Sequence, residues 1–270
     1  MKTTQTTFLR MIVGIWLLLG PTASEAAPIV GPLLQTTWGQ DGVWQQSTPL
    51  KDGNPTFPGC TTIATAQILY FYQYLDRPLK PVSYVLDHEV YGEDIEDWTL
   101  SLDLTQFQYD WSGFAESEED DPTRVKATAE FLYHVGVSLN AQFGGGEGAS
   151  ATGKQIENAF RYQWGFNHKS RRSMSIISKT AFGLNHTEWA DLIREELDEG
   201  RPVLYLAQQK GEPAGHAFVV DGYRDDGSFH INWGWGGYGN GYYQLRGLTD
   251  PEGRQWTREP MMYRGLEPTE

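Results

Sequence analysis

The sequence predicts an α+β protein with two lobes, on the basis of two observations. Helical patterns occupy the first part of the 270-residue chain, and strand-like segments separated by glycine-rich turns occupy the last part. That order is typical of proteins in which helices and an antiparallel sheet form separate layers. Aromatic residues make up 13% of the chain and include ten tryptophans, which indicates a packed core rather than disorder.

The N-terminal residues are typical of a signal peptide. A basic segment precedes a short apolar run at residues 11–20, and Ser24-Glu25-Ala26 supplies a small-residue cleavage site. The run is about half as long as a membrane-spanning helix requires. We therefore expect residues 1–26 to be removed, residues 27–270 to form one domain, and the protein to be secreted (extracellular or periplasmic) and free of the membrane after cleavage. An N-terminal membrane anchor is the alternative.

Charge and cysteine content exclude several classes of protein. The formal net charge is −14, whereas nucleic-acid binding requires clustered Lys and Arg, so we expect no nucleic-acid partner. A single cysteine leaves no disulfide within the chain and excludes a cysteine-rich zinc site. We expect neither a metal nor another cofactor.

The strongest helical pattern covers residues 60–76, where apolar side chains recur nearly all round and so predict a buried helix. Pro58-Gly59 precedes it and Arg77-Pro78 follows it, which agrees with known start and stop signals. Further helices are predicted at residues 123–138, 154–162 and 187–199, the last with Thr187 as its N-cap. Connecting segments are expected at residues 27–59 and 87–122.

The C-terminal part predicts an antiparallel sheet. Strands are expected at residues 203–207, 216–223, 228–233 and 242–245. The turn at residues 223–227 joins the second and third of them into a hairpin. If this turn is centred near Asp225, Asn232 lies opposite Phe218 and shares a face with His216.

Cys60 is the first candidate for chemistry. It lies in the first turn of the buried helix, where unpaired N–H groups and the helix dipole favour an anion. Both effects lower a thiol pKa, and the thiolate is the nucleophilic form. A free thiol in an exported protein is also prone to oxidation unless it is buried or used. A buried structural cysteine is the other interpretation.

A cysteine nucleophile requires a base, and His216 is the best of six histidines. It follows Gly215 and begins an apolar strand, and the predicted register brings Asn232 beside it. An asparagine in that place can accept the ring N–H, as in Cys-His-Asn sites. The indole of Trp233 can cover this polar pair from water. His230, on the next strand, is the reserve candidate.

These segments together resemble the streptopain family of secreted bacterial cysteine peptidases, which have a papain-like fold. Residues 59–68 resemble the nucleophile motif of that family, and residues 215–222 resemble its histidine motif. Residues 229–237 are similar to the segment that follows, and Trp38-Gly39-Gln40 to the stretch that carries an oxyanion glutamine. The resemblance covers nearly all of the mature chain.

The resemblance implies a helical N-terminal lobe, an antiparallel C-terminal lobe and an active site in the cleft between them. It implies cleavage of peptide bonds through an acyl-enzyme, with Cys60 as nucleophile and His216 as its base. Gln40 and the Cys60 N–H would hold the oxyanion, while Asn232 and Trp233 would orient and shield His216. Two further positions are implied to line the substrate cleft, Ser150 and Gly215.

The resemblance also implies protein or peptide substrates. Streptopain is made with a long inhibitory pro-domain, for which residues 27–37 leave no room before Trp38. We therefore expect no pro-domain in this sequence and regard a separate proteinaceous inhibitor as one way to restrain the enzyme. Two other functions stay open: a catalytically silent papain-like binding module, and a papain-like acyl- or amidotransferase.

Overall fold

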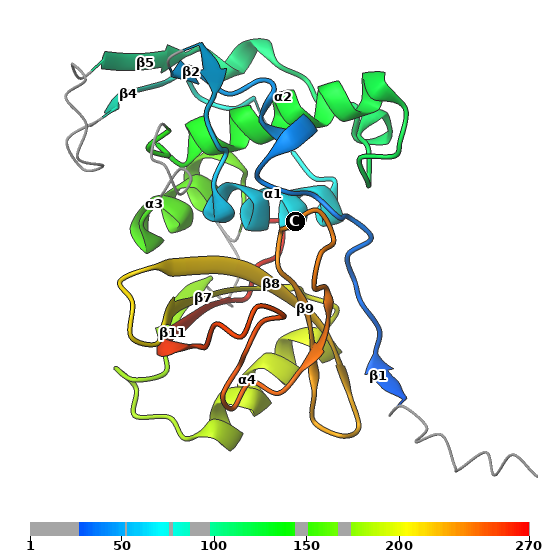
Figure 1. The fold of residues 1–270 in the computed structure, drawn as a ribbon. Helices are drawn as coiled ribbons and strands as arrows, with labels where there is room; N and C mark the ends of the chain where they lie inside the picture. Colours follow the sequence, from blue (N-terminus) through cyan, green and yellow to red (C-terminus); the bar gives the residue numbers. More distant parts are fainter. Residues whose placement is uncertain are drawn as a thin grey trace, which may run out of the picture.

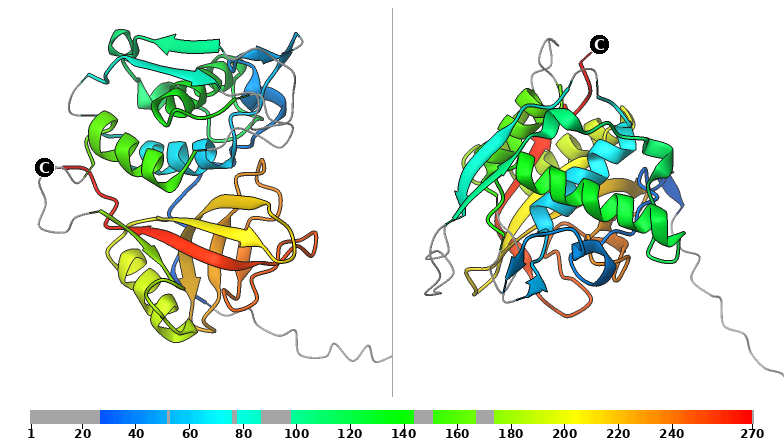
Figure 2. Two further views of the ribbon diagram at one scale, coloured as in Figure 1. Left: turned by 90° about the vertical axis from the view of Figure 1, so that its left-hand side faces the viewer. Right: turned by 90° about the horizontal axis from the view of Figure 1, so that it is seen from above.

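The computed structural model has two lobes, and it describes residues 27–51, 53–75, 78–86, 98–143, 151–166 and 174–269. The upper lobe in Figure 1 holds helices α1 (Cys60–Tyr72), α2 (Pro122–Ser138) and α3 (Gly153–Asn158). The lower lobe holds a sheet and helix α4 (His186–Asp198), and the side view in Figure 2 separates the two lobes. The predicted α+β class is thereby confirmed. The predicted signal peptide and Ser150 lie outside the described residues.

The sheet of the lower lobe is antiparallel and has seven strands. Their order is β10-β9-β8-β7-β11-β6, and β1 pairs with β8 outside this path. The strands are β1 (Pro28–Val30), β6 (Ser175–Ser178), β7 (Val203–Gln209), β8 (Gly215–Arg224), β9 (Phe229–Asn232), β10 (Gly241–Tyr243) and β11 (Trp256–Arg264). Strands β7 to β10 correspond to the four predicted ones.

Strand β11 is central in the sheet but was not predicted. Its sequence contains charged residues and Pro260, which lacks the N–H that a ladder requires. The structure accommodates the proline in a bulge, since the register with β7 shifts between Arg258 and Met261 and Glu259 has a φ of 46°. Tertiary pairing therefore overrides a local sequence that argues against a central strand.

The two predicted connecting segments contain short elements as well. The first holds β1, the 3-10 turn η1 (Gly42–Gln45), and the paired strands β2 (Leu50–Lys51) and β3 (Asn54–Pro55). In the second, β5 (Trp98–Leu102) pairs with β4 (Val82–Leu86) before two 3-10 turns, η3 (Leu104–Gln106) and η4 (Trp111–Gly113). A π-helical turn, η5 (Ala159–Gln163), follows α3. Such short elements carry too little periodicity to be read from sequence.

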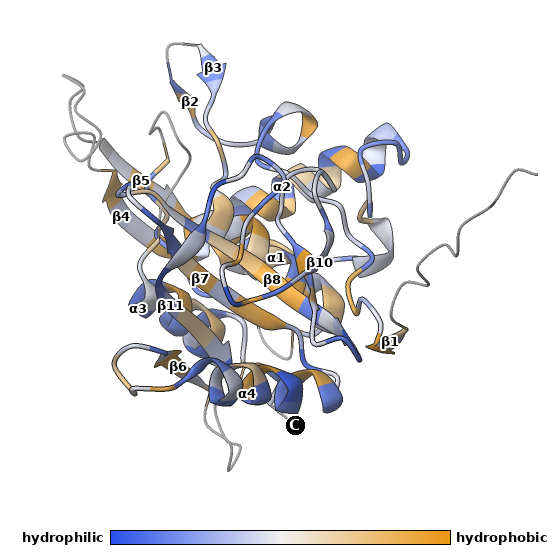
Figure 3. Cartoon of the chain, turned by 60° about the horizontal axis from the view of Figure 1, so that its bottom comes forward, coloured by the Kyte–Doolittle hydropathy of each residue, from blue (hydrophilic) through white to orange (hydrophobic). Residues whose placement is uncertain are grey.

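Helix α1 begins at Cys60 because of the residue before it. Gly59 has φ 87° and ψ 151°, a conformation that residues with a side chain rarely adopt. The helix ends at Tyr72 rather than at the predicted residue 76, because Gln73 takes a left-handed conformation with φ 48°. Figure 3 shows α1 and β8 mainly in the colour of apolar residues, which agrees with a buried helix against a buried strand.

The sheet is covered on both faces, and alternate residues of β8 divide between them. Ala217 and Val219 belong to the core that contains α1. Phe218 and Val220 belong to the core that contains Trp189 of α4. Because side chains alternate along a strand, His216 is directed to the α4 side of the sheet.

Helix α4 starts one residue earlier than predicted. Its N-cap is Asn185 rather than Thr187, and Asn185 forms a capping box with Glu188. Within the described ranges, no helix has the combined length and apolar character needed to span a membrane.

Candidate active site

Cys60 lies between the two lobes and contacts the main chain of β8. Its side chain is half-buried at the first turn of α1. Strand β9 pairs with β8 only from Val219 to Tyr223. Outside that pairing, the backbone N–H of Ala217 donates to the Cys60 sulfur. The nucleophile candidate is therefore held beside the residue that follows His216 in the chain.

Two opposing effects act on the Cys60 thiol. Burial raises its pKa, whereas hydrogen bonds from the backbone N–H groups of Ala217, Thr61 and Cys60 itself lower it. Burial is the larger effect, so the thiol is protonated at rest. The position in the helix predicted a lowered pKa instead. The difference arises because β8 covers the helix end that would otherwise face water.

The His216 ring is fixed by a main-chain carbonyl. Its Nε2 lies 2.9 Å from the carbonyl oxygen of Trp233. A carbonyl oxygen only accepts hydrogen bonds, so Nε2 carries the proton in the neutral ring. This leaves Nδ1 as the nitrogen with a free lone pair. The ring is thus held in the tautomer that can take up a proton at Nδ1.

Tryptophan side chains enclose this ring. The His216 ring centre is 4.8 Å from that of Trp235 and 5.3 Å from that of Trp256. His216 itself is only 7% exposed. Burial lowers its pKa to about 4, although the hydrogen bond to Trp233 acts in the opposite direction. The imidazole is therefore neutral at pH 7 and available as a base.

The register of the β8–β9 hairpin differs from the predicted one. The turn closes between Arg224 and Ser228, one residue later than expected, and the register shifts again between Val220 and Gly222. Asn232 consequently pairs with Val219 instead of Phe218. It faces the α1 side of the sheet, opposite to His216, because a shift of one residue exchanges the faces.

Asn232 does not bond the His216 ring, contrary to the expectation from sequence. Its Oδ1 accepts from Gln67 Nε2 at 3.3 Å and from Gly234 N at 3.1 Å, and its Nδ2 donates to Thr36 O at 2.8 Å. The side chain is buried and joins α1, the N-terminal segment and the loop after β9. Asn232 thereby positions the loop whose first residue, Trp233, supplies the carbonyl for His216.

Trp233 contributes through its main chain as well as its indole. The indole is fully buried and stacks on that of Trp235, with ring centres 5.1 Å apart. The sequence indicated the shielding indole but not the carbonyl, because every residue carries a carbonyl and no pattern marks which one is used.

Gln40 lies next to the same loop. The Gly236 N–H donates to the Trp38 carbonyl at 3.1 Å, and a Cβ on Gly39 would lie 2.9 Å from the Gly236 nitrogen. Only glycine permits this approach. The half-buried Gln40 and the Trp235 ring line one cavity of about 460 Å³. Gln40 thus shares a cavity with Trp235, the residue whose ring stacks on His216.

Gly215 lies at the exposed start of β8, directly before His216. A Cβ at this position would meet only the Ala207 carbonyl, at 3.9 Å, so the site leaves open space there. Its predicted contact with substrate stays a prediction.

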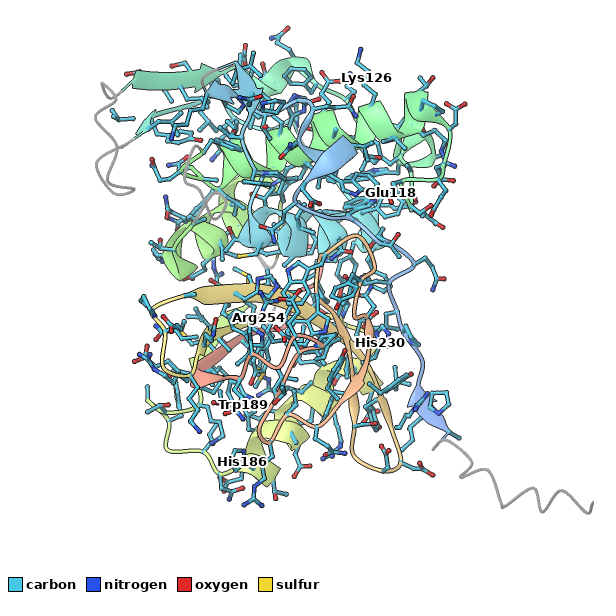
Figure 4. All side chains as sticks on the ribbon, viewed as in Figure 1. Glu118, Lys126, His186, Trp189, His230 and Arg254 are labelled. Carbon is cyan, nitrogen blue, oxygen red and sulfur yellow. The ribbon has the colours of Figure 1, made fainter. Side chains whose placement is uncertain are left out.

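Sequence reasoning missed a pair of charged residues beside the tryptophans. The Arg254 guanidinium lies 4.8 Å from the Trp235 ring centre and 5.7 Å from that of Trp256. Asp250, which is buried, accepts from Arg254 Nε at 2.7 Å and from Trp256 Nε1 at 2.9 Å. In Figure 4, Arg254 lies in the sheet lobe above Trp189 and His186 of α4. No motif in the sequence marked this pair.

His230, the reserve candidate, has a different partner. Its Nδ1 lies 2.6 Å from Asp221 Oδ1, and Asp221 Oδ2 accepts from the Leu34 N–H at 3.0 Å. This pair fixes the N-terminal segment against β8 and has no contact with Cys60. In the part of the chain that the structure describes, no group of three or more His, Cys, Asp or Glu residues could hold a metal ion.

Comparison with known proteins gives consistent matches. Residues 38–243 match the model of the peptidase C10 family. Streptopain of Streptococcus pyogenes is 29% identical over 243 residues, which cover 84% of this chain and 58% of that protein. The thiol protease/hemagglutinin PrtT of Porphyromonas gingivalis is 31% identical over 230 residues, covering 80% of this chain and 24% of that protein. The chain thus spans less than two thirds of the length of these relatives.

Solved structures agree with the sequence matches. The active wild-type interpain A cysteine protease of Prevotella intermedia superposes with a TM-score of 0.76 at 29% identity, covering 88% of this chain and 94% of that one. A prointerpain A fragment gives a TM-score of 0.72 at 28% identity, covering 89% of this chain and 73% of that one. The family match spans the cysteine, the histidine and the glutamine discussed above, and the chain belongs to the peptidase C10 family.

Proposed function

We propose that the chain is a cysteine endopeptidase that hydrolyses peptide bonds in protein substrates. One observation carries this proposal. The Cys60 sulfur accepts a hydrogen bond from the N–H of Ala217, the residue that follows His216. His216 is buried, and its Nε2 is hydrogen-bonded to the carbonyl oxygen of Trp233. A thiol beside a neutral base of fixed tautomer is the arrangement that nucleophilic catalysis by cysteine requires.

The proposed reaction begins when the Cys60 sulfur attacks the substrate carbonyl and His216 Nδ1 takes the thiol proton. Gln40 and the Cys60 N–H stabilise the negative oxygen of the tetrahedral intermediate. His216 then returns its proton to the leaving amine, and the acyl group stays on sulfur as a thioester. Water, deprotonated by His216, hydrolyses the thioester and restores the thiol.

The named relatives support hydrolysis over the alternatives. The solved structural neighbour is described as a cysteine protease and PrtT as a thiol protease. A silent binding module would have no use for the tautomer control at His216. A transferase would use the same chemistry, but nothing in the described residues favours it over hydrolysis.

Casein digestion tests the proposal. We expect cleavage in the presence of a thiol reductant, complete inhibition by the cysteine-directed reagent E-64, and no cleavage by Cys60→Ser. Asp191→Asn, on the exposed face of α4, should cleave as the parent does. Labelling of Cys60 by E-64 without cleavage of any protein would point to a transferase, and absence of both would exclude an enzyme of this type.

Export and restraint are further parts of the proposal. The signal-like residues 1–26 support secretion, and a mature N-terminus at Ala27 in exported protein would test it. The described N-terminal segment runs along β8, where Leu33 and Leu34 bind Asp221, and does not line the cavity beside Gln40. It therefore leaves that cavity open. We propose a separate proteinaceous inhibitor as one way to restrain the enzyme. A protein from the same source that inhibits casein cleavage would support this role.

A further inference from the structure

The cavity beside Gln40 begins at two groups of the proposed mechanism. Gln40 lies on one wall, and Trp235 on another, with its ring 4.8 Å from that of His216. In peptide hydrolysis, the amine that leaves must lie within reach of the histidine that protonates it. A cavity that shares a wall with the His216 ring is therefore placed to receive the residue on the leaving-group side of the scissile bond.

Charge in and around this cavity is predominantly negative. Arg254 is its basic residue, and this guanidinium is bound to buried Asp250 at 2.7 Å and to Glu252 at 3.0 Å. Asp41 also lines the cavity and has no ion pair in the described part of the chain. The carboxylates of Asp41, Asp250 and Glu252 thus outnumber the single guanidinium of Arg254. The Glu252 side chain is half-exposed to solvent.

The remaining walls are aromatic. Phe57, Trp235 and Tyr238 line the cavity, and 56% of the Tyr238 surface is exposed. A long basic side chain suits such a lining, because its aliphatic stem packs on rings while its charged end reaches carboxylates. An acidic side chain in this cavity would be repelled by Asp41 and Glu252. Arg254, the basic residue that lines the cavity, is already paired with Asp250 and Glu252.

From these observations we infer that the cavity binds the first residue after the scissile bond and favours Arg or Lys there, through Asp41 and Glu252. The inference rests on the proposed peptidase activity and extends it to substrate preference. Each exposed ion pair changes binding only modestly, so the expected preference is about twofold to tenfold. It should weaken in high salt, which screens exposed charges.

Three fluorogenic peptides that differ only in this residue test the inference. With Arg, Gln or Glu after the scissile bond, kcat/KM should fall in that order. The double variant Asp41→Asn/Glu252→Gln should bring the Arg and Gln peptides to within about twofold of each other, since both pairings are lost. Asp191→Asn is the matched control, because it removes a carboxylate outside the cavity and should keep the preference.

The outcomes separate this inference from the function on which it rests. Cleavage of all three peptides at equal rates, or best cleavage of the Glu peptide, would overturn the charge preference alone. A preference for Arg that the double variant retains would assign it to other residues. If none of the peptides is cleaved at any salt concentration, the proposed function fails, and this inference fails with it.

Discussion

Two histidines on neighbouring strands of one sheet, His216 on β8 and His230 on β9, lie in different environments. His216 faces the α4 side, has a carbonyl as its partner and is covered by indoles. His230 has a buried carboxylate, Asp221, 2.6 Å from its Nδ1. By residue type alone, the His230–Asp221 pair looks more like a catalytic dyad than His216 does.

The comparison shows that the position of a histidine decides its use more than the identity of its partner. The hydrogen bonds from His230 through Asp221 end at the Leu34 N–H, so they hold the N-terminal segment against the sheet. The hydrogen bond from Trp233 holds His216, and the next residue in the chain, Ala217, donates its N–H to the Cys60 sulfur. A neutral carbonyl fixes the tautomer of His216 without adding a negative charge that would favour the protonated ring.

Exchanging the two rings for alanine gives the largest expected effect. His216→Ala should lower kcat/KM by about a thousandfold or more, because the base and the acid of the reaction are lost together. His230→Ala should retain activity within a few-fold. Peptide hydrolysis by both purified variants measures the difference, and equal losses would contradict the assignment of His216 as base.

The pH dependence of hydrolysis is expected to follow the buried His216. A ring protonated at Nδ1 cannot accept the thiol proton, so activity is lost as pH falls through the histidine pKa of about 4. An ordinary histidine would be only about 3% neutral at pH 5. We therefore expect kcat/KM to be nearly constant from pH 7 to pH 5 and to decline below it.

A pH–rate profile, with circular dichroism at each pH to confirm the folded state, checks this expectation. Half-maximal activity near pH 6.5 would mean that the ring is open to water during catalysis.

A smaller effect is expected when the cover of the His216 ring is loosened. Arg254→Met removes the cation from Trp235 and should lower kcat by about threefold to tenfold, the range of a partly buried cation–π contact. Arg194→Met is the matched control, since Arg194 lies 5.2 Å from the Phe229 ring far from the site. An equal kcat for the parent and Arg254→Met would show that Trp235 and Trp256 keep their positions without the Arg254 cation.

The smallest effect concerns stability alone. His230→Ala leaves the buried Asp221 Oδ1 without its donor, which costs about 1–3 kcal/mol. Each kcal/mol corresponds to about 2–4 °C in a protein of this size, so Tm should fall by several degrees. His186→Ala, at an exposed position on α4, should leave Tm unchanged and serves as the control. A Tm equal to that of the parent would mean that water replaces the ring.

Much of the fold was predictable because its elements have long, regular patterns. Helix α1 and strands β7 to β9 are apolar over many residues, and each was placed within a few positions of its bounds. Strand β11 was missed because Pro260 sits in a bulge that only its neighbours stabilise. Asn232 was placed on the wrong face because one turn residue and one bulge changed the pairing with β8.

The sequence by itself determined the chemical groups of this protein: one cysteine at a helix start, one histidine at the start of an apolar strand, and a glutamine near the N-terminus. Local preferences and side-chain chemistry suffice for the cysteine and the histidine, whereas the glutamine was indicated only by the resemblance to the streptopain family. Tertiary structure alone decided how the groups are held. A main-chain carbonyl orients His216, Asn232 joins three segments behind it, and Asp250 with Arg254 fixes the tryptophans around it. These contacts join residues distant in the chain, and only packing brings them together.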